Sequence, residues 1–261
     1  MRVSIVQMNV QPEDVRGNWD KAYVGLQEAA RRHSQTILLP EMWSTGFSPR
    51  IRDVARDAFL PTLDFLRDAA KEAGAWVLSS IPEISDDRVF NTLFYVSPKG
   101  EVAGRYQKIH LFPLIEEHAY ITAGSLPLTV DTPWCRIGGM ICFDLRFPEL
   151  ARRLALLGAR VLLVPAQFPH PRQDHWITLL RARAIENQLY MVAANIVGSS
   201  GKQEFFGHSC VVDPWGQVCD ALDDQPGVVT VDLDLDTIET VRSRLPAWPA
   251  RRADVYGNCE A

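Results

Sequence analysis

The chain has 261 residues and a formal net charge of −5, with 47% hydrophobic and 23% charged residues. This composition is typical of a globular protein with enough residues to bury a large core, and it lacks the basic stripe of a nucleic-acid-binding protein. The chain opens as a strand and not as a signal peptide, and no apolar run is long enough to cross a bilayer, so we expect no nucleic-acid or membrane partner and a cytoplasmic location.

Hydrophobic periodicity predicts strands and helices that alternate along the chain. The strands predicted in the first half are residues 2–8, 36–40 and 75–80, followed by a hairpin of residues 90–96 and 101–107. The helices predicted there are residues 18–32 and 61–73. The second of these is expected to start at Pro61, because proline is favoured in the first turn of a helix.

The same alternation continues through the second half of the chain. The predicted strands are residues 136–142, 160–165 and 189–195, with two or three more between residues 208 and 233. The predicted helices are residues 148–157, closed by Gly158, and residues 173–187. Because no Pro/Gly/Ser-rich linker interrupts the pattern, we expect one α/β domain over residues 1–261.

The cysteines and histidines indicate neither disulfides nor a metal site. The cysteines are odd in number and form no Cys-x-x-Cys pair, and the six histidines are scattered. We therefore expect reduced thiols and no bound metal. The cysteines are Cys135, Cys142, Cys210, Cys219 and Cys259.

Three residues occupy positions that suit chemistry. Glu41 follows a buried strand, at the edge of a sheet where active-site side chains project; alone, it would also fit a solvated loop. Cys142 stands between a predicted strand and a helix, the setting of an exposed nucleophile, although a lone cysteine is more often a buried structural residue. Lys108 follows a strand and precedes an apolar stretch, where a surface lysine is the plainer interpretation.

Taken together, the segments around these residues resemble the nitrilase superfamily of carbon–nitrogen hydrolases, whose catalytic glutamate, lysine and cysteine occur in this order. The matching segments are Leu-Pro-Glu-Met at Glu41, Lys-Ile-His-Leu-Phe at Lys108 and Ile-Cys-Phe-Asp-Leu-Arg-Phe-Pro-Glu at Cys142. The resemblance runs from Arg2 to about Tyr256. It implies a four-layer α-β-β-α sandwich with two central sheets, commonly paired as a homodimer.

Within that superfamily the chain looks most like the ω-amidase branch, which acts on 2-oxoglutaramate and 2-oxosuccinamate. The supporting segments are residues 39–47, 144–149, 175–188 and 245–249. The resemblance implies a small-molecule amide substrate and no cofactor. An N-carbamoyl amino-acid hydrolase or a nitrilase with the same triad is the alternative enzyme, and a non-catalytic binding module on the same fold is the alternative of another class.

The superfamily also implies a second active-site glutamate between the lysine and the cysteine. Glu116 and Glu117 both lie in that interval, and Glu117 matches better because it stands seven residues before Gly124. The resemblance further suggests that the backbone N–H of Phe143 shares the oxyanion with Lys108.

Four more side chains are candidates for substrate binding. Arg146 is expected either to pair with Glu149 or to bind a substrate carboxylate. Trp43 and Phe168 are candidates for the pocket wall, as is Trp176, and core packing is the competing interpretation for all three aromatic residues.

These residue types suit amide hydrolysis. A thiolate is a strong nucleophile, and a carboxylate beside it takes and returns the proton. We expect Cys142 to attack the amide, Glu41 to pass its proton to the departing ammonia, and water to hydrolyse the thioester that remains.

Overall fold

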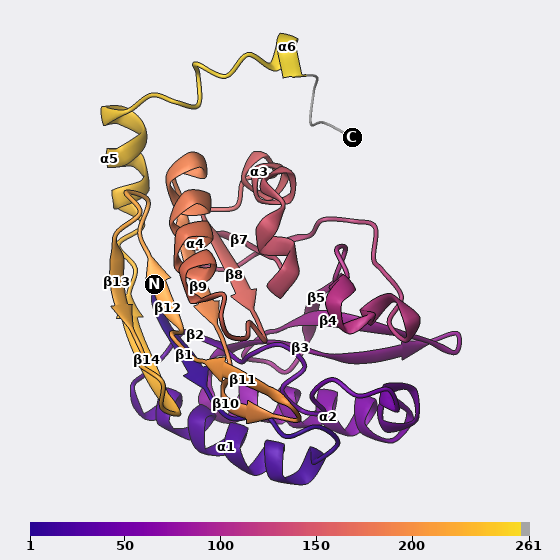
Figure 1. The fold of residues 1–261 in the computed structure, drawn as a ribbon. Helices are drawn as coiled ribbons and strands as arrows, with labels where there is room; N and C mark the ends of the chain where they lie inside the picture. Colours follow the sequence, from indigo (N-terminus) through magenta and orange to yellow (C-terminus); the bar gives the residue numbers. More distant parts are fainter. Residues whose placement is uncertain (257–261) are drawn as a thin grey trace.

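The structure is a computed structural model that describes residues 1–256 (Figure 1), so Cys259 lies outside the described residues. Two six-stranded sheets lie face to face, and helices cover their outer sides. This is the α-β-β-α sandwich that the resemblance implied, and the predicted fold class is confirmed.

The first sheet combines three parallel strands in its centre with antiparallel strands at its edges. Its order is β14-β1-β2-β3-β4-β5, in which β1, β2 and β3 run parallel. The strands are β1 (Arg2–Gln7), β2 (Thr36–Leu38), β3 (Trp76–Ser85), β4 (Arg88–Val96), β5 (Val102–Gln107) and β14 (Gly227–Asp232).

The second sheet repeats this plan, with β7, β8 and β9 parallel in its centre. Its order is β13-β12-β9-β8-β7-β6. The strands are β6 (Thr129–Asp131), β7 (Arg136–Gly139), β8 (Val161–Pro165), β9 (Tyr190–Ala194), β12 (Cys210–Val212) and β13 (Val218–Ala221). A separate hairpin of β10 (Val197–Ser200) and β11 (Gln203–Phe206) lies beside the two sheets.

Side-chain alternation along the strands explains the layers. Ile5 and Leu38 belong to the apolar cluster shared by the two sheets, whereas their neighbours Val6 and Ile37 belong to the cluster under the helices. Successive strand residues point to opposite faces, so a strand that is apolar on both faces must be covered on both. The covering helices are α1 (Val15–Arg31) and α2 (Ile51–Ala73) on the first sheet, and α3 (Pro148–Leu156) and α4 (Gln173–Asn187) on the second.

Three predicted boundaries are wrong: the start of α2, the end of β7 and the end of β3. Helix α2 starts at Ile51 and contains Pro61 in its interior, because the buried stripe of Ile51, Ala55 and Ala58 extends the apolar face upstream and Pro61 faces solvent. The strand expected over residues 136–142 ends at Gly139, and the chain then turns into a short 3₁₀ helix, η3 (Cys142–Arg146). Strands β6, β10 and β11 and helices α5 (Asp236–Arg244) and α6 (Ala253–Tyr256) were not predicted.

The remaining predicted elements match the structure to within a few residues, apart from β3, which runs five residues beyond its predicted end. Among the described residues, no helix combines the length and the apolar character needed to cross a bilayer.

Candidate active site

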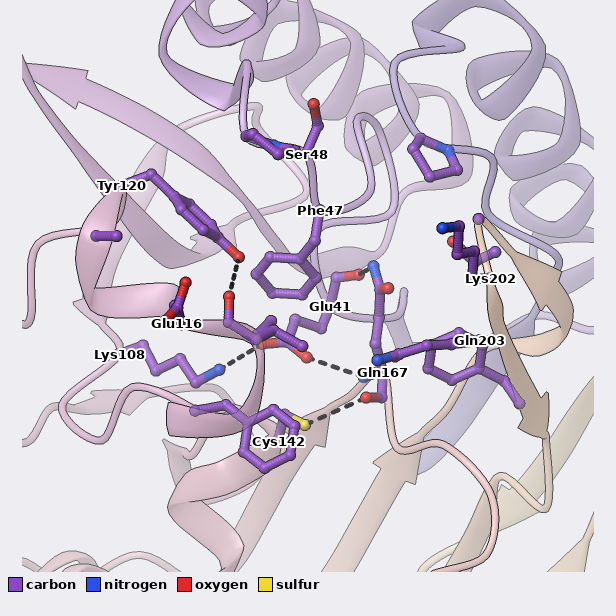
Figure 2. Close-up of a pocket in the computed structure, with 18 residues that line it drawn as sticks. Glu41, Phe47, Ser48, Lys108, Glu116, Tyr120, Cys142, Gln167, Lys202 and Gln203 are labelled. Carbon is purple, nitrogen blue, oxygen red and sulfur yellow. Dashed lines mark hydrogen bonds and ion pairs between the residues drawn. The ribbon is translucent and has the colours of Figure 1, made fainter.

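The candidate catalytic residues gather where strands of the two sheets end. Glu41 follows β2, Lys108 directly follows β5, and Cys142 follows β7. All three line one cavity of about 480 Å³ (Figure 2). Active-site side chains of α/β sheets project from this edge, because the loops after parallel strands converge there.

A buried ammonium joins two buried carboxylates in this cavity. The Nζ of Lys108 donates to Glu41 Oε1 at 2.8 Å and to Glu117 Oε2 at 2.9 Å. All three side chains are at most 1% exposed. Glu116 is exposed at the cavity instead, so Glu117 is the glutamate of the pair that reaches the lysine.

Burial and charge set the protonation of this group. Burial raises the pKa of Glu41, although the Lys108 ammonium opposes the rise. Burial alone would lower the pKa of Lys108, but its attraction to Glu41 and Glu117 outweighs that penalty and raises the pKa above its ordinary value. Lys108 therefore stays charged, and Glu41 is the carboxyl suited to carry a proton.

Cys142 sits on a strained turn, with φ of +47° in the left-handed region that non-glycine residues rarely adopt. The turn presents the thiol to the cavity, and the Sγ donates to the backbone carbonyl of Gln167 at 3.6 Å. Burial first, and then the Glu41 carboxylate, raise the pKa of Cys142 well above its ordinary value. The resting thiol of Cys142 is therefore neutral.

Asp144 ties this turn to the lysine segment. Its buried carboxylate accepts from the backbone N–H of Ile141 at 2.9 Å and from that of His110 at 2.9 Å, and also from Tyr106 Oη at 2.7 Å. One side chain thus fixes the position of the residue before Cys142 relative to the segment just after Lys108.

Two further residues orient Glu41, and neither was identified from the sequence. Asn91 Nδ2 donates to Glu41 Oε1 at 2.8 Å, and the backbone N–H of Gln167 donates to Glu41 Oε2 at 2.9 Å. Asn91 is a buried polar residue within β4, and Gln167 follows the end of β8 as Glu41 follows β2. Those positions are the signals in the sequence that point to them.

The aromatic candidates divide between the core and the site. Trp43 is fully buried, donates its indole N–H to Ser79 Oγ, and lines no cavity at the site, so the expectation that it walls the pocket is wrong. Core packing decided its position, because β2 and the turn after it fill the space under α2. Trp176 is likewise in the core, whereas Phe143 and Phe168 line a narrow side cleft that also reaches Cys142.

Arg146 also lines this side cleft, and the alternative ion pair with Glu149 does not form in the described chain. Within residues 1–256, Cys135, Cys142, Cys210 and Cys219 are free thiols, and no three His, Cys, Asp or Glu side chains gather as a metal site.

Comparison with known proteins places this geometry among carbon–nitrogen hydrolases. The carbon-nitrogen hydrolase family profile matches residues 2–243. The chain is 34% identical to a 2-oxoglutaramate amidase of Bacillus subtilis (strain 168), covering 97% of this chain and 98% of that one. It is also 34% identical to a deaminated glutathione amidase of Homo sapiens, over 98% and 84% of the two chains. A solved CN-hydrolase superfamily protein of Xanthomonas campestris, with an arsenic adduct in its active site, superposes with a TM-score of 0.91 at 34% identity over 97% of each chain.

Proposed function

Since the chain belongs to the carbon–nitrogen hydrolase family, we propose that it hydrolyses the ω-amide of a small 2-oxo dicarboxylic acid, such as 2-oxoglutaramate or 2-oxosuccinamate, through a thioester on Cys142. The sequence-based assignment to this family, and to hydrolases of carbon–nitrogen bonds, is confirmed. The observation that carries the proposed mechanism is the buried ammonium of Lys108, held between Glu41 and Glu117 in the cavity that Cys142 lines.

The first step is attack by Cys142 on the amide carbon. Because burial keeps the thiol neutral, its proton has to leave as the bond forms, and Glu41 is the base that takes it. The carbonyl oxygen becomes an oxyanion beside the Lys108 ammonium. The backbone N–H of Phe143, which has no hydrogen-bond partner within residues 1–256, is the second donor.

The second step breaks the carbon–nitrogen bond. Glu41 returns the proton to the amide nitrogen, the oxyanion collapses to a carbonyl, and ammonia leaves. Cys142 then carries the acyl group as a thioester. Glu41, again a carboxylate, takes a proton from water as the water oxygen attacks the thioester. The carbon–sulfur bond then breaks, the carboxylic acid product leaves, and Glu41 gives its proton to the departing thiolate, which restores the thiol.

Glu117 acts on this cycle through Lys108. It accepts from Lys108 Nζ with both oxygens, at 3.1 and 2.9 Å, and from the backbone N–H of Phe112 at 2.6 Å. A second carboxylate keeps the lysine charged and fixed while Glu41 is protonated. We therefore assign Glu117 a positioning role, together with a share in placing the hydrolytic water.

The substrate class is inferred from charge beside the nucleophile. Arg146 is a half-buried cation in the side cleft that reaches Cys142, without an acidic partner within residues 1–256. A remote carboxylate on the substrate would bind there by charge-assisted hydrogen bonds and position the ω-amide for attack. The name of the Bacillus subtilis relative fits an acid of this kind.

The test is a comparison of kcat/KM across 2-oxoglutaramate, 2-oxosuccinamate, matched nitriles, N-carbamoyl amino acids, deaminated glutathione and a neutral monoamide. We expect the two oxo-acid amides to lead by at least about tenfold, roughly 1.4 kcal/mol of transition-state preference. A nitrile or an N-carbamoyl compound in first place would refute this substrate class.

Intact-mass analysis of a quenched reaction tests the covalent step separately. An acyl adduct should appear in the wild type and be absent in Cys142→Ala, whose folding is checked by circular dichroism. An adduct that maps to another cysteine would overturn the assignment of Cys142 as the nucleophile.

We also propose that the chain forms a homodimer, as the family resemblance implied. Light scattering at several protein concentrations tests this, and a monomer throughout the range would overturn it.

A further inference from the structure

A narrow side cleft opens next to Cys142, and Lys108 is absent from its lining. It shares Phe112, Cys142 and Gln167 with the larger cavity. Two arginines from separate segments, Arg146 and Arg172, contribute to its walls. Arg146 ends η3, and Arg172 immediately precedes α4.

Aromatic rings support both guanidinium groups. The Cζ of Arg146 lies 5.3 Å from the ring centroid of Phe168 and 5.9 Å from that of Phe143. The Cζ of Arg172 lies 5.6 Å from the centroid of Phe112. Such contacts hold a cation in place without neutralising it, so each arginine is ordered before any ligand arrives.

Neither arginine has an acidic partner. Across residues 1–256, no carboxylate oxygen lies within 4.0 Å of Arg146 or Arg172, although most other arginines of this chain form ion pairs. The Arg146 guanidinium contacts His175 Nδ1 at 3.4 Å. Burial first, and then the nearby Arg172, lower the pKa of Arg146, although the Cys142 group opposes the fall. Two half-buried like charges therefore stand close together, and an anion between them would relieve their repulsion.

We propose that Arg172 and Arg146 together form the subsite for the substrate's remote carboxylate, and that Arg172 selects 2-oxo acid amides over neutral amides. This inference rests on the proposed function and adds the second cation. Guanidinium groups present planar forks of N–H donors that match a carboxylate and an adjacent ketone oxygen.

The size of the cleft limits what enters it. Its volume of about 10 Å³ holds one water-sized group. One carboxylate oxygen matches this space, whereas the rest of the substrate has to lie in the larger cavity. A small charged end and a short chain are therefore the features that the paired arginines would recognise.

The experiment compares Arg172→Gln, Arg172→Lys and wild type on 2-oxoglutaramate and on butyramide, a neutral amide. For Arg172→Gln we expect KM for 2-oxoglutaramate to rise at least about tenfold, while kcat/KM for butyramide changes by less than about threefold. Arg172→Lys should recover part of the loss, because it restores the charge without the fork. Arg16→Gln is the matched control: Arg16 is exposed on α1 and lines neither cavity.

Binding without turnover provides a second readout. In a Cys142→Ala background, 2-oxoglutarate should bind at least about tenfold more weakly once Arg172 is glutamine, as measured by calorimetry. An equal loss on both amides, or an unchanged affinity for 2-oxoglutarate, would overturn the subsite. If the wild type hydrolyses no oxo-acid amide yet binds 2-oxoglutarate through Arg172, the proposed function fails and the subsite stands.

Discussion

At the residue scale, the Glu41 carboxylate both hinders and enables the nucleophile. Its charge raises the pKa of Cys142, yet in the proposed mechanism it is the base that removes the thiol proton. Glu41→Gln separates these effects. We expect turnover to fall by about 10²- to 10⁴-fold, while the pKa of the thiol falls because the nearby negative charge is gone and Lys108 stays.

Two measurements on Glu41→Gln check this prediction. Steady-state assays give the loss of turnover, and the pH dependence of iodoacetamide alkylation, mapped to Cys142 by mass spectrometry, gives the thiol midpoint. The midpoint should move to lower pH in the variant. Glu101→Gln, which removes an exposed carboxylate away from the cavity, is the control. A midpoint that moves upward would contradict the electrostatic argument.

Asn91 is the residue whose removal tests how Glu41 is held. Asn91→Ala deletes the donor to Glu41 Oε1 and leaves a buried carboxylate with one fewer partner. Hydrogen bonds to charged groups are worth about 1.5–3 kcal/mol, so kcat should fall by about ten- to a hundredfold with KM little changed. Because a hydrogen bond to the carboxylate lowers its pKa, the acidic limb of the kcat/KM profile should move to higher pH.

Asn195→Ala is the matched control for that experiment. Asn195 is also buried, but it bonds only to backbone groups and to Ser209 through its own backbone. Its loss should lower the free energy of unfolding and leave the acidic limb in place. An unmoved limb in Asn91→Ala would show that this side chain is merely structural.

The candidate site was predictable where chemistry and sequence motif coincide. Glu41, Lys108 and Cys142 stand in segments specific enough to resemble a family, and the structure brings the three together. Asn91, Gln167 and Arg172 carry no such motif, because their importance comes from contacts between distant segments, such as the 126-residue separation between Gln167 and Glu41.

At the element scale, the turn at Cys142 depends on Asp144. The carboxylate accepts hydrogen bonds from Ile141, His110 and Tyr106. Asp144→Asn replaces one carboxylate oxygen with an NH2 group, which donates hydrogen bonds and cannot accept them from these donors. We expect the free energy of unfolding to fall by about 3 kcal/mol, and activity to fall as the turn loses its geometry. Urea unfolding and kcat/KM measure the two effects.

Tyr106→Phe is the graded comparison for Asp144→Asn. It removes one of the bonds to Asp144 and keeps those that hold Ile141 and His110, so the loss should be only about 1–2 kcal/mol. If Asp144→Asn is as stable and as active as the wild type, the turn does not depend on this carboxylate.

Elements whose apolar residues recur at one clear spacing were predictable from the sequence. Elements that depend on contacts with distant segments of the chain were not. Helix α1 was predicted to within three residues, because Ala22, Leu26 and Ala29 form one buried stripe at helical spacing. The short β6, with three residues, has too few side chains to show a period, and its pairing with β7 decides its shape. Pro61 misled the prediction of α2, because a proline is tolerated on a solvent-facing side of a helix when the buried stripe continues.

At the scale of the whole molecule, the two-sheet arrangement followed from the family resemblance and not from periodicity. The pattern of strands predicted an α/β protein, but it contained no information on whether the strands form one sheet or two. That depends on which buried faces meet, as those of β1 and β9 do. The single-domain organisation and the homodimer stay predictions.

The proposed mechanism uses no metal ion, and dialysis of the whole protein against a chelator tests this. We expect full activity after exhaustive treatment with a strong chelator, because the proposed steps use the thiol, carboxylate and ammonium groups of Cys142, Glu41 and Lys108. Iodoacetamide treatment should abolish activity in the same preparation. Loss of activity on chelation, with recovery on adding zinc, would overturn the mechanism.

Alkaline pH should destabilise the fold through buried thiols. Burial raises the pKa of Cys135 to about 11 and that of Cys210 to about 12, whereas exposed cysteines titrate near about pH 8.5. Between those values the unfolded chain has released protons that the folded chain still binds, so the free energy of unfolding falls as pH rises. The stabilising contribution is complete below about pH 8.5 and is lost through the alkaline range. At about pH 10 we expect a loss of roughly 2 kcal/mol for each thiol, measured by urea unfolding against the value at neutral pH. Cys210→Ala removes one titrating group, and its loss over the same interval should be smaller by about that amount. An equal loss in the variant would assign the alkaline transition to other groups.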